Sequence, residues 1–210
     1  MRPDEIEKTS FEIIKNEAGE HGFAPHHWAV VARMIHTSAD FEYLNTVRIH
    51  PEAVDAGIAA IKQGRPIITD TSMALAGLRK KDLAGYGCEA ACFMASQEIA
   101  HMAEKNGTTR AEAAVDVAAD AMAGGIYVIG NAPTALMRLI ALIRQGIANP
   151  ALVVGFPVGF VNAAESKAEL LTVDTPYITN TGRKGGSNVA AAVVNALILL
   201  AKTYYGFVTK

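Results

Sequence analysis

The chain has 210 residues, of which half are hydrophobic and 19% are charged, and its formal net charge is -2. This length suits one large core, so we expect residues 1–210 to form a single domain. The weak charge and the absence of a long Lys/Arg run exclude the electrostatic surface that a nucleic-acid partner needs. The charged fraction is below the roughly 25% of average soluble proteins, which predicts an oligomer with a buried interface.

Cysteine usage and hydrophobic runs restrict the class further. Cys88 and Cys92 are the only cysteines, and their spacing fits neither a disulfide framework nor a zinc site, so no metal is expected. The first residues mix acids and bases where a secretory signal requires an uninterrupted apolar stretch, which predicts a cytoplasmic protein. The run from Val189 to Ala201 is interrupted by Asn195 and is shorter than the ~20 residues of a membrane span. It predicts a buried or interfacial helix and no membrane partner.

Helical periodicity covers the first 35 residues, where two helices are predicted. Pro3 suits the first turn of a helix, and apolar side chains then recur at helical spacing in an apolar stripe, at Ile6, Phe11, Ile13 and Ile14. After Pro25, a second helix with its own apolar residues is predicted to end at His36.

Beyond these helices, short apolar runs alternate with glycine-bearing turns and alanine-rich stretches. The runs predict five strands, at residues 66–70, 88–94, 126–130, 151–155 and 176–180. Helices are predicted at residues 51–62, 108–122, 135–145, 163–171 and 188–204. Because most crossovers contain a helix, we predict an α/β fold, a three-layer αβα arrangement with a largely parallel central sheet of about five strands.

In an open parallel sheet, ligands bind beyond the carboxyl ends of the strands. Asn131 can cap a helix in one loop there, and Gly185, Gly186 and Ser187 precede a long helix in another. Small residues and helix N-termini expose amide donors to anions. Each loop alone could be an ordinary turn, but several together predict a ligand with multiple carboxylates or phosphates. Neither a dinucleotide fingerprint, a P-loop nor a nucleophile elbow is present.

One of the six histidines, His36, has a basic neighbour in the sequence that could bind an anion. Arg33 lies three residues before His36, so both side chains share a helical face. Thr37, Ser38 and Asp40 are expected to orient the imidazole, which is the natural proton donor near neutral pH. Spacing alone leaves two readings open, a structural histidine at a capped helix end and a proton donor beside an anion-binding arginine.

Five segments, in order and at their separations, closely resemble one family. They are IHTSADFEY, ITDTSMALAG, IGNAPTAL, GFPVGFVNAAESK and GRKGGSN, and the family is that of precorrin-8X methylmutase, also called cobalt-precorrin-8 methylmutase. The similarity runs from about Ile6 to Leu200, and the fourth segment followed by GRKGGS is highly specific.

The resemblance implies an isomerase of cobalamin biosynthesis. It would move a methyl group from C-11 to C-12 of precorrin-8X or cobalt-precorrin-8, giving hydrogenobyrinate or cobyrinate, and it would be a homodimer. A methyl shift along a conjugated macrocycle needs no redox cofactor and no nucleophile, so no cofactor is expected. Protonation of the ring by a positioned acid would contribute on the order of 100-fold to 10,000-fold.

The resemblance also implies roles for particular residues. His36 matches the proton donor and acceptor, Arg33 would contact substrate carboxylates, and Ser10 matches a substrate-contacting serine. Further substrate contacts are expected at Arg110, Asp70 and Thr71, beside the loop residues Asn131, Gly185, Gly186 and Ser187. This chain departs from the pattern at Ala39, where many members have glycine, and at Glu7, where at least one relative has tyrosine.

Two other functions remain open from the sequence. One is a corrinoid carrier that holds the product without forming it. The other is an α/β enzyme that acts on a smaller polyanionic metabolite with the same loops and His36. Incubation with the precursor, and the width of the pocket, would separate these alternatives.

Overall fold

The computed structural model describes residues 2–94 and 96–203. The strands of this part are β1 (Val47–Ile49), β2 (Ile67–Thr69), β3 (Ala90–Ala91), β4 (Ile126–Ile129), β5 (Leu152–Gly155) and β6 (Tyr177–Asn180). The helices are α1 (Pro3–Ala18), α2 (Pro25–Ser38), α3 (Tyr43–Thr46), α4 (Ala53–Lys62), α5 (Ser72–Gly77), α6 (Lys80–Ala84), α7 (Gln97–Asn106), α8 (Arg110–Ala118), α9 (Pro133–Arg144), α10 (Ala163–Leu170) and α11 (Ser187–Thr203). The predicted end of the last helix, residue 204, lies outside the described residues.

The strands form one sheet in the order β1-β6-β5-β4-β2-β3. All neighbours are parallel except β1, which pairs antiparallel with β6 and places Arg48 opposite Thr179. After β2 the chain continues to β3 on one side, whereas after β4 it continues to β5 on the other side. The boundary between β2 and β4 is therefore a topological switch point, where α/β proteins commonly bind ligands.

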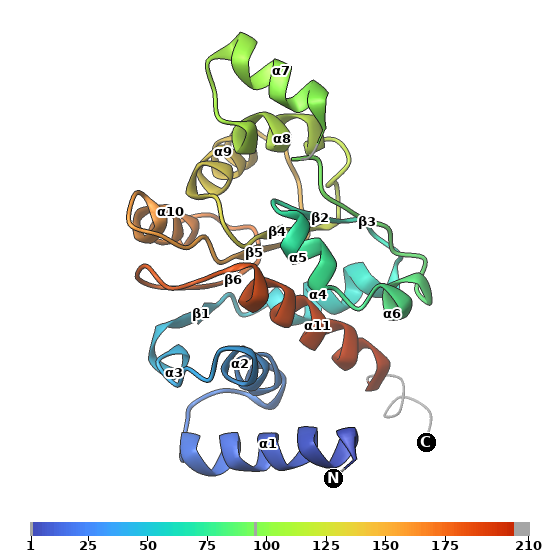
Figure 1. The fold of residues 1–210 in the computed structure, drawn as a ribbon, viewed down its shortest axis with the longest axis vertical. Helices are drawn as coiled ribbons and strands as arrows, with labels where there is room; N and C mark the ends of the chain where they lie inside the picture. Colours follow the sequence, from blue (N-terminus) through green and yellow to red (C-terminus); the bar gives the residue numbers. More distant parts are fainter. Residues whose placement is uncertain (1, 95, 204–210) are drawn as a thin grey trace.

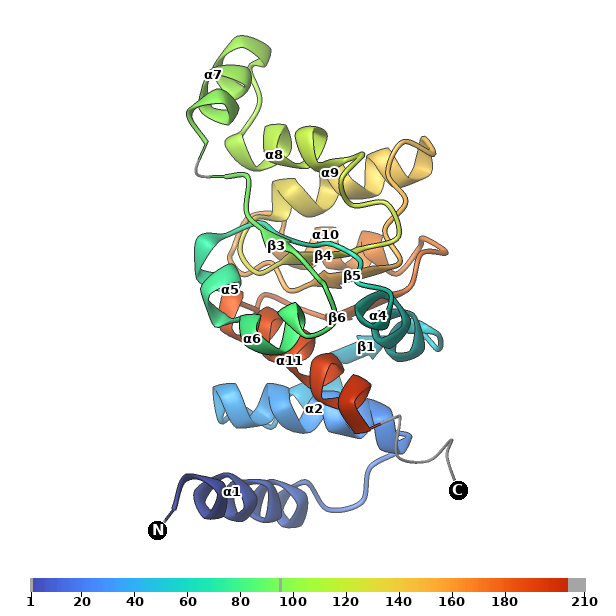
Figure 2. The ribbon, with the colours of Figure 1, turned by 90° about the vertical axis from the view of Figure 1, so that its right-hand side faces the viewer.

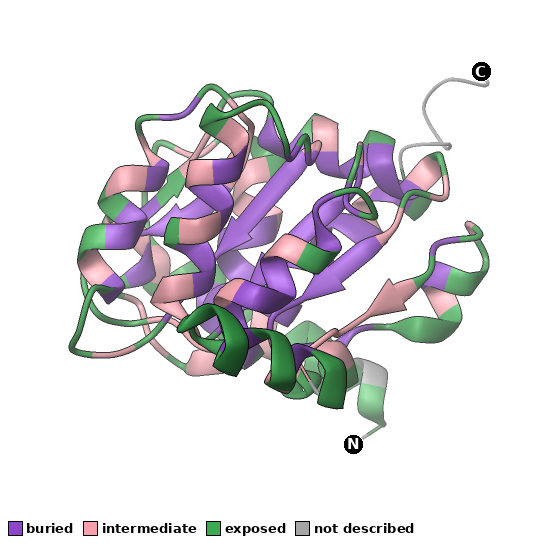
Figure 3. Cartoon of the chain, turned by 90° about the horizontal axis from the view of Figure 1, so that it is seen from above, coloured by how far each residue is buried: buried purple, intermediate pink, exposed green. Residues whose placement is uncertain are grey.

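Alternation of side chains along the strands builds two cores. In β4, Ile126 and Val128 face the core that contains α2, α4 and α11, whereas Tyr127 and Ile129 face the core that contains α8 and α9. Successive side chains of a strand point to opposite faces, and both faces of the central strands are buried (Figure 3). The near-continuous apolar runs in the sequence follow from this double burial.

The predicted three-layer α/β fold with a largely parallel sheet is confirmed. Further helices pack on the outer surfaces of its helical layers. Figures 1 and 2 show α4 and α11 on one face of the sheet and α9 and α10 on the other. Helix α2 then packs on α11, and α1 packs on α2. At the opposite extreme, α7 packs on α8. The N-terminal helices α1 and α2 therefore form a further layer outside α11.

The predicted elements differ from the structure in three places. The sheet has a sixth strand, β1, whose three residues include the exposed Arg48 and so lack an apolar run. The run predicted at 88–94 pairs only at Ala90 and Ala91. Helices α3, α5, α6 and α7 were not predicted, because they are short or largely polar. The apolar stripe of α1 is only partly covered, since Ile6 and Ile13 are about half exposed.

Helix α2 has recognisable ends. Pro25 occupies its first turn, where a missing amide hydrogen costs nothing. At the other end, Ala39 adopts a left-handed conformation with φ of 53°. This conformation favours glycine, because a side chain there crowds the backbone. Among the described residues, no helix is long and apolar enough to cross a membrane.

Candidate functional site

The loops that follow the parallel strands meet at one edge of the sheet. The hydroxyls of Thr71, after β2, and Ser187, after β6, lie 2.8 Å apart. The amide of Gly186 donates to the Phe156 carbonyl after β5 at 2.9 Å. A Cβ on Gly130, after β4, would lie 2.5 Å from the Cα of Ser187. Only glycine permits that approach, so the predicted convergence of small-residue loops is confirmed.

Asp70 holds this junction together. Its side chain is 2% exposed, and its Oδ1 accepts from the Gly130 amide at 2.8 Å. Its Oδ2 accepts from the amides of Asn131 and Ala132 at 2.9 Å each. Burial raises the pKa of Asp70, although the amide hydrogen bonds act in the opposite direction. The carboxylate thus occupies the anion position at the start of α9, at the switch point itself.

His36 lies exposed near the end of α2. Its ring stacks on the ring of Phe11 from α1, with centroids 4.9 Å apart and planes inclined by 14°. A cavity of about 400 Å³ lies beside it and is lined by residues from α1, α2 and the segment after α2, among them Ser10, Glu17 and Phe41. In the described part of the chain, neither ring nitrogen of His36 has a hydrogen-bond partner, so both are open to a ligand.

Among the described residues, none of the side chains that could orient the imidazole is hydrogen-bonded to it. The Ser38 hydroxyl donates to the Met34 carbonyl at 2.7 Å. Asp40 accepts from the Lys184 ammonium at 2.6 Å. Thr37 lines a separate cavity of about 290 Å³ together with Ser187. The imidazole is instead held by the aromatic face of Phe11, a residue that sequence periodicity presents only as part of an apolar stripe.

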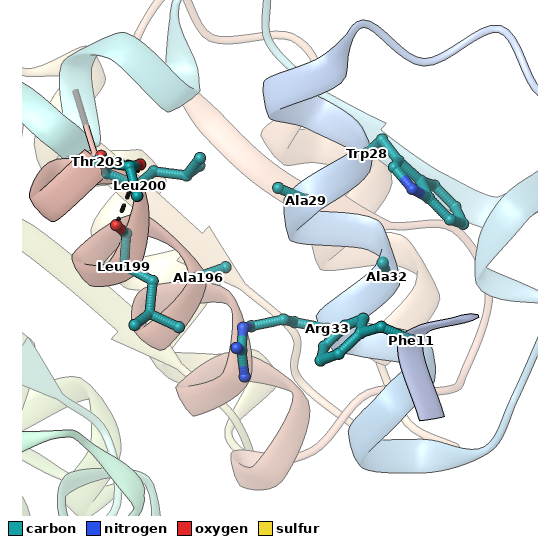
Figure 4. A pocket seen from close by; sticks show the side chains of 9 residues that line it. All are labelled: Phe11, Trp28, Ala29, Ala32, Arg33, Ala196, Leu199, Leu200 and Thr203. Atoms are coloured by element: carbon teal, nitrogen blue, oxygen red, sulfur yellow. Dashed lines mark hydrogen bonds between the residues drawn. The ribbon is translucent and has the colours of Figure 1, made fainter. Parts of the chain in front are cut away.

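Arg33 shares the face of α2 that carries His36. Its guanidinium carbon lies 5.0 Å from the centroid of the same Phe11 ring, and its Nη2 lies 2.8 Å from the Glu7 carboxylate. Figure 4 shows Arg33 extending from α2 toward α11 across a hollow of about 320 Å³. The hollow is mostly apolar, with Trp28 and Leu199 among its lining residues. A cation on an apolar wall suits a ligand with acidic groups at the edge of a large ring.

Lys184 joins the glycine loop after β6 to the segment after α2. Its ammonium contacts Asp40 at 2.6 Å and Glu42 at 2.7 Å. These contacts raise the pKa of Lys184 and lower that of Asp40. The ion pairs therefore fix the end of the His36 helix against the loop that contains Gly185 and Gly186.

The expected site residues fall into three groups. Ser10, Arg33 and His36 lie together on α1 and α2. A second group surrounds the strand ends, at Asp70, Thr71, Asn131, Gly185, Gly186 and Ser187. Arg110 stands apart, exposed at the start of α8, which packs against α7 and α9 on the other side of the sheet from α2. No group of three or more metal-binding side chains occurs among the described residues.

Two residues that support the candidate site, Phe11 and Lys167, were not identified from the sequence. Phe11 could not be found, because its role depends on packing between two helices. Lys167 carried a signal, since Ala163, Ser166, Lys167 and Leu170 follow a buried helical stripe. A lysine on such a stripe is directed toward the core, and in the structure Lys167 is buried.

A largely parallel α/β sheet whose amide-rich loops meet near a helix bearing a histidine and an arginine is the arrangement of an α/β protein with a ligand site at the carboxyl ends of its strands. Comparisons with known proteins make the class specific. Residues 5–200 match the sequence model of the precorrin-8X methylmutase family. A cobalt-precorrin-8 methylmutase of Leptospira interrogans is 47% identical and matches 93% of each chain.

Two further relatives agree. A precorrin-8X methylmutase of Pseudomonas aeruginosa is 37% identical, over 91% of this chain and 93% of its own. The crystal structure of a precorrin-8X methylmutase from Thermus thermophilus has a TM-score of 0.89 and 46% identity, covering 99% of this chain and all of that one. The chain belongs to the precorrin-8X methylmutase family and is an isomerase of cobalamin biosynthesis. The resemblance seen in the sequence is thereby confirmed.

Proposed function

We propose that this chain moves a methyl group from C-11 to C-12 of precorrin-8X or cobalt-precorrin-8, with His36 as proton donor and acceptor. The names of its relatives support the substrate. The observation that carries the assignment of His36 is its position, exposed beside a cavity, with unpaired ring nitrogens, one turn from Arg33. A proton donor must be within reach of the ligand before its acidity matters.

The chemistry follows from that position. His36 donates a proton to the conjugated ring, which makes the framework electron-deficient and lowers the barrier to migration. The methyl group leaves C-11 with its bonding electrons and forms the new bond at C-12. The proton then returns to His36, so the net change is an isomerisation. Phe11 restrains the imidazole, which keeps its ring in one orientation for both transfers.

Substrate binding would divide between two surfaces. Arg33 and Ser10 receive acidic side chains of the macrocycle near His36, while Asn131, Gly185, Gly186, Ser187 and Thr71 would contribute contacts from the strand ends. Arg33 suits this role because a guanidinium binds carboxylates in a bidentate manner. For Asp70 we propose a positioning role, because both its oxygens already accept amide hydrogen bonds.

We further propose that residues 1–210 form one domain that works in the cytoplasm as a homodimer. Low charge and the half-exposed Ile6 and Ile13 of α1 support an interface between copies. Arg110 lies on the far side of the sheet from α2. If it contacts the ligand that His36 protonates, it must come from the second copy.

The test is an anaerobic incubation of the purified chain with metal-free and with cobalt-loaded precursor, followed by absorbance. Conversion of either precursor to the corrin spectrum supports the proposal and identifies the natural substrate. Tight pigment binding without conversion would instead favour a carrier. Light scattering measures the mass in solution, and a monomeric mass that persists in the active enzyme would contradict the dimer.

A further inference from the structure

Lys167 lies on α10 beneath the glycine loop and is 1% exposed. Its Nζ donates to Asn180 Oδ1 at 3.1 Å and to the Lys184 carbonyl at 2.5 Å. The side-chain amide of Asn180 donates to that same carbonyl at 3.0 Å. Two side chains from different elements therefore fix one peptide group of the loop.

The ammonium of Lys167 has no carboxylate partner among the described residues. Acids on neighbouring segments pair with other cations: Glu169 pairs with Arg144 between α10 and α9, and Asp40 and Glu42 pair with Lys184. Burial alone lowers the pKa of Lys167 to about 8. A buried cation without an anion is costly, so the uncompensated charge of Lys167 favours an anion that a ligand supplies.

The orientation of the Lys184–Gly185 peptide indicates where such an anion would bind. In a trans peptide, the carbonyl and the following amide hydrogen point in opposite directions. Because the Lys184 carbonyl points inward to Lys167, the Gly185 amide points outward from the loop. No acceptor for that amide occurs within the described residues. A Cβ at Gly185 would lie 2.4 Å from the Phe156 carbonyl, so the backbone of the loop packs closely against the segment after β5.

We propose that Lys167 is a positioning residue for substrate binding, which turns the Gly185 amide outward to a carboxylate of the ligand and strengthens that contact with its charge. This inference rests on the proposed function, because the carboxylate belongs to the macrocycle. It assigns Lys167 no contact with the reacting atoms.

The test compares two ligands on two variants. Product-type corrinoids are used, hydrogenobyrinate with free carboxylates and its fully methylated ester. Lys167→Met keeps the length and volume of the side chain but loses the charge and the donor. We expect its Kd for the acid to rise about tenfold relative to wild type, with the Kd for the ester nearly unchanged. Lys202→Met, which removes an exposed lysine paired with Asp82, should change neither.

An equal weakening of binding for both ligands would mean that Lys167 only supports the fold, and an unchanged Kd for the acid would also overturn the proposal.

Should Lys167→Met fail to fold, the wild-type protein with ¹³Cε-labelled lysine provides the same test. The Lys167 resonance is expected to titrate at higher pH in the complex with the acid than in the free protein, and not in the complex with the ester. An identical titration in all three states would refute the coupling. Wild-type protein that binds the acid without converting precursor contradicts the proposed catalysis and not this role.

Discussion

The imidazole of His36 on α2 and the phenyl ring of Phe11 on α1 stack with their centroids 4.9 Å apart, where the two helices pack together. This contact restrains a side chain that has no hydrogen bond to the rest of the described chain. Arg33 lies over the same phenyl ring. Phe11 thus sets the relative positions of the proposed proton donor and the proposed anion-binding group.

His36→Asn should remove turnover and preserve ligand binding. Asn has nearly the same reach but cannot exchange a proton near neutral pH, so we expect kcat to fall about 100-fold to 10,000-fold. Single-turnover absorbance gives the rate, and titration with the product gives the Kd. His101→Asn, at an exposed position of α7, is the control and should turn over normally. Retained rearrangement in His36→Asn would refute the assignment.

Phe11→Leu should impair catalysis moderately, because it removes the aromatic face that restrains His36. Aromatic stacking contributes about 0.5 to 1.5 kcal/mol, so we expect kcat/KM to fall about twofold to tenfold. Phe23→Leu is the matched control, since Phe23 is also partly buried but contacts His21 instead. Equal effects of both substitutions would indicate loss of packing and no specific support for His36.

Glu7→Gln should improve binding of an acidic ligand. Glu7 neutralises Arg33 at 2.8 Å, and a substrate carboxylate must compete with it. Exposed ion pairs contribute up to about 1 kcal/mol, so KM should fall by no more than about fivefold. Glu12→Gln, which disrupts a long pair with Lys8 on the same helix, serves as the control. A higher KM in Glu7→Gln would show that Glu7 helps to hold the ligand.

Asp70→Asn should destabilise the protein substantially. Three backbone amides donate to the two carboxylate oxygens of Asp70, whereas an asparagine side chain has only one oxygen. Its NH₂ group would face backbone N–H groups, so donor would lie against donor. We expect a loss of about 2 to 4 kcal/mol in the free energy of unfolding, measured with denaturant. Asp116→Asn disrupts a more exposed pair with Arg138 and should cost less than about 1 kcal/mol. A fully stable Asp70→Asn would argue against the positioning role.

Lys184→Gln should show an acid-dependent effect on stability. Lys184 lowers the pKa of Asp40 below its ordinary value of 3.8. A carboxyl group with a lowered pKa contributes stability above the ordinary value, and that contribution is lost as the pH falls through the folded-state pKa. The difference in melting temperature between wild type and variant should therefore be full at about pH 6 and shrink towards about pH 3. A difference independent of pH would exclude the ion pair as its cause.

The glycine-bearing loops were predictable from the sequence because their position depends only on residues close to them in the chain. An apolar run ending in a small residue places the following loop at the carboxyl end of a parallel strand, whichever neighbours that strand acquires. For the same reason, the spacing of Arg33 and His36 fixed their common helical face. The short strand β1 and the polar helix α7 escaped prediction, because neither has a long apolar pattern.

The sequence by itself determined the βα rhythm, the loops that gather at the sheet edge and the motifs that identify the family. These depend on residues close together in the chain, where periodicity and backbone preference act directly. Only the tertiary structure decided that Asp70 binds the amides around Gly130, that Phe11 supports His36 and that Lys167 lies under Lys184. Each of these contacts joins segments distant in sequence, and burial and distance between such segments arise only when the whole core packs.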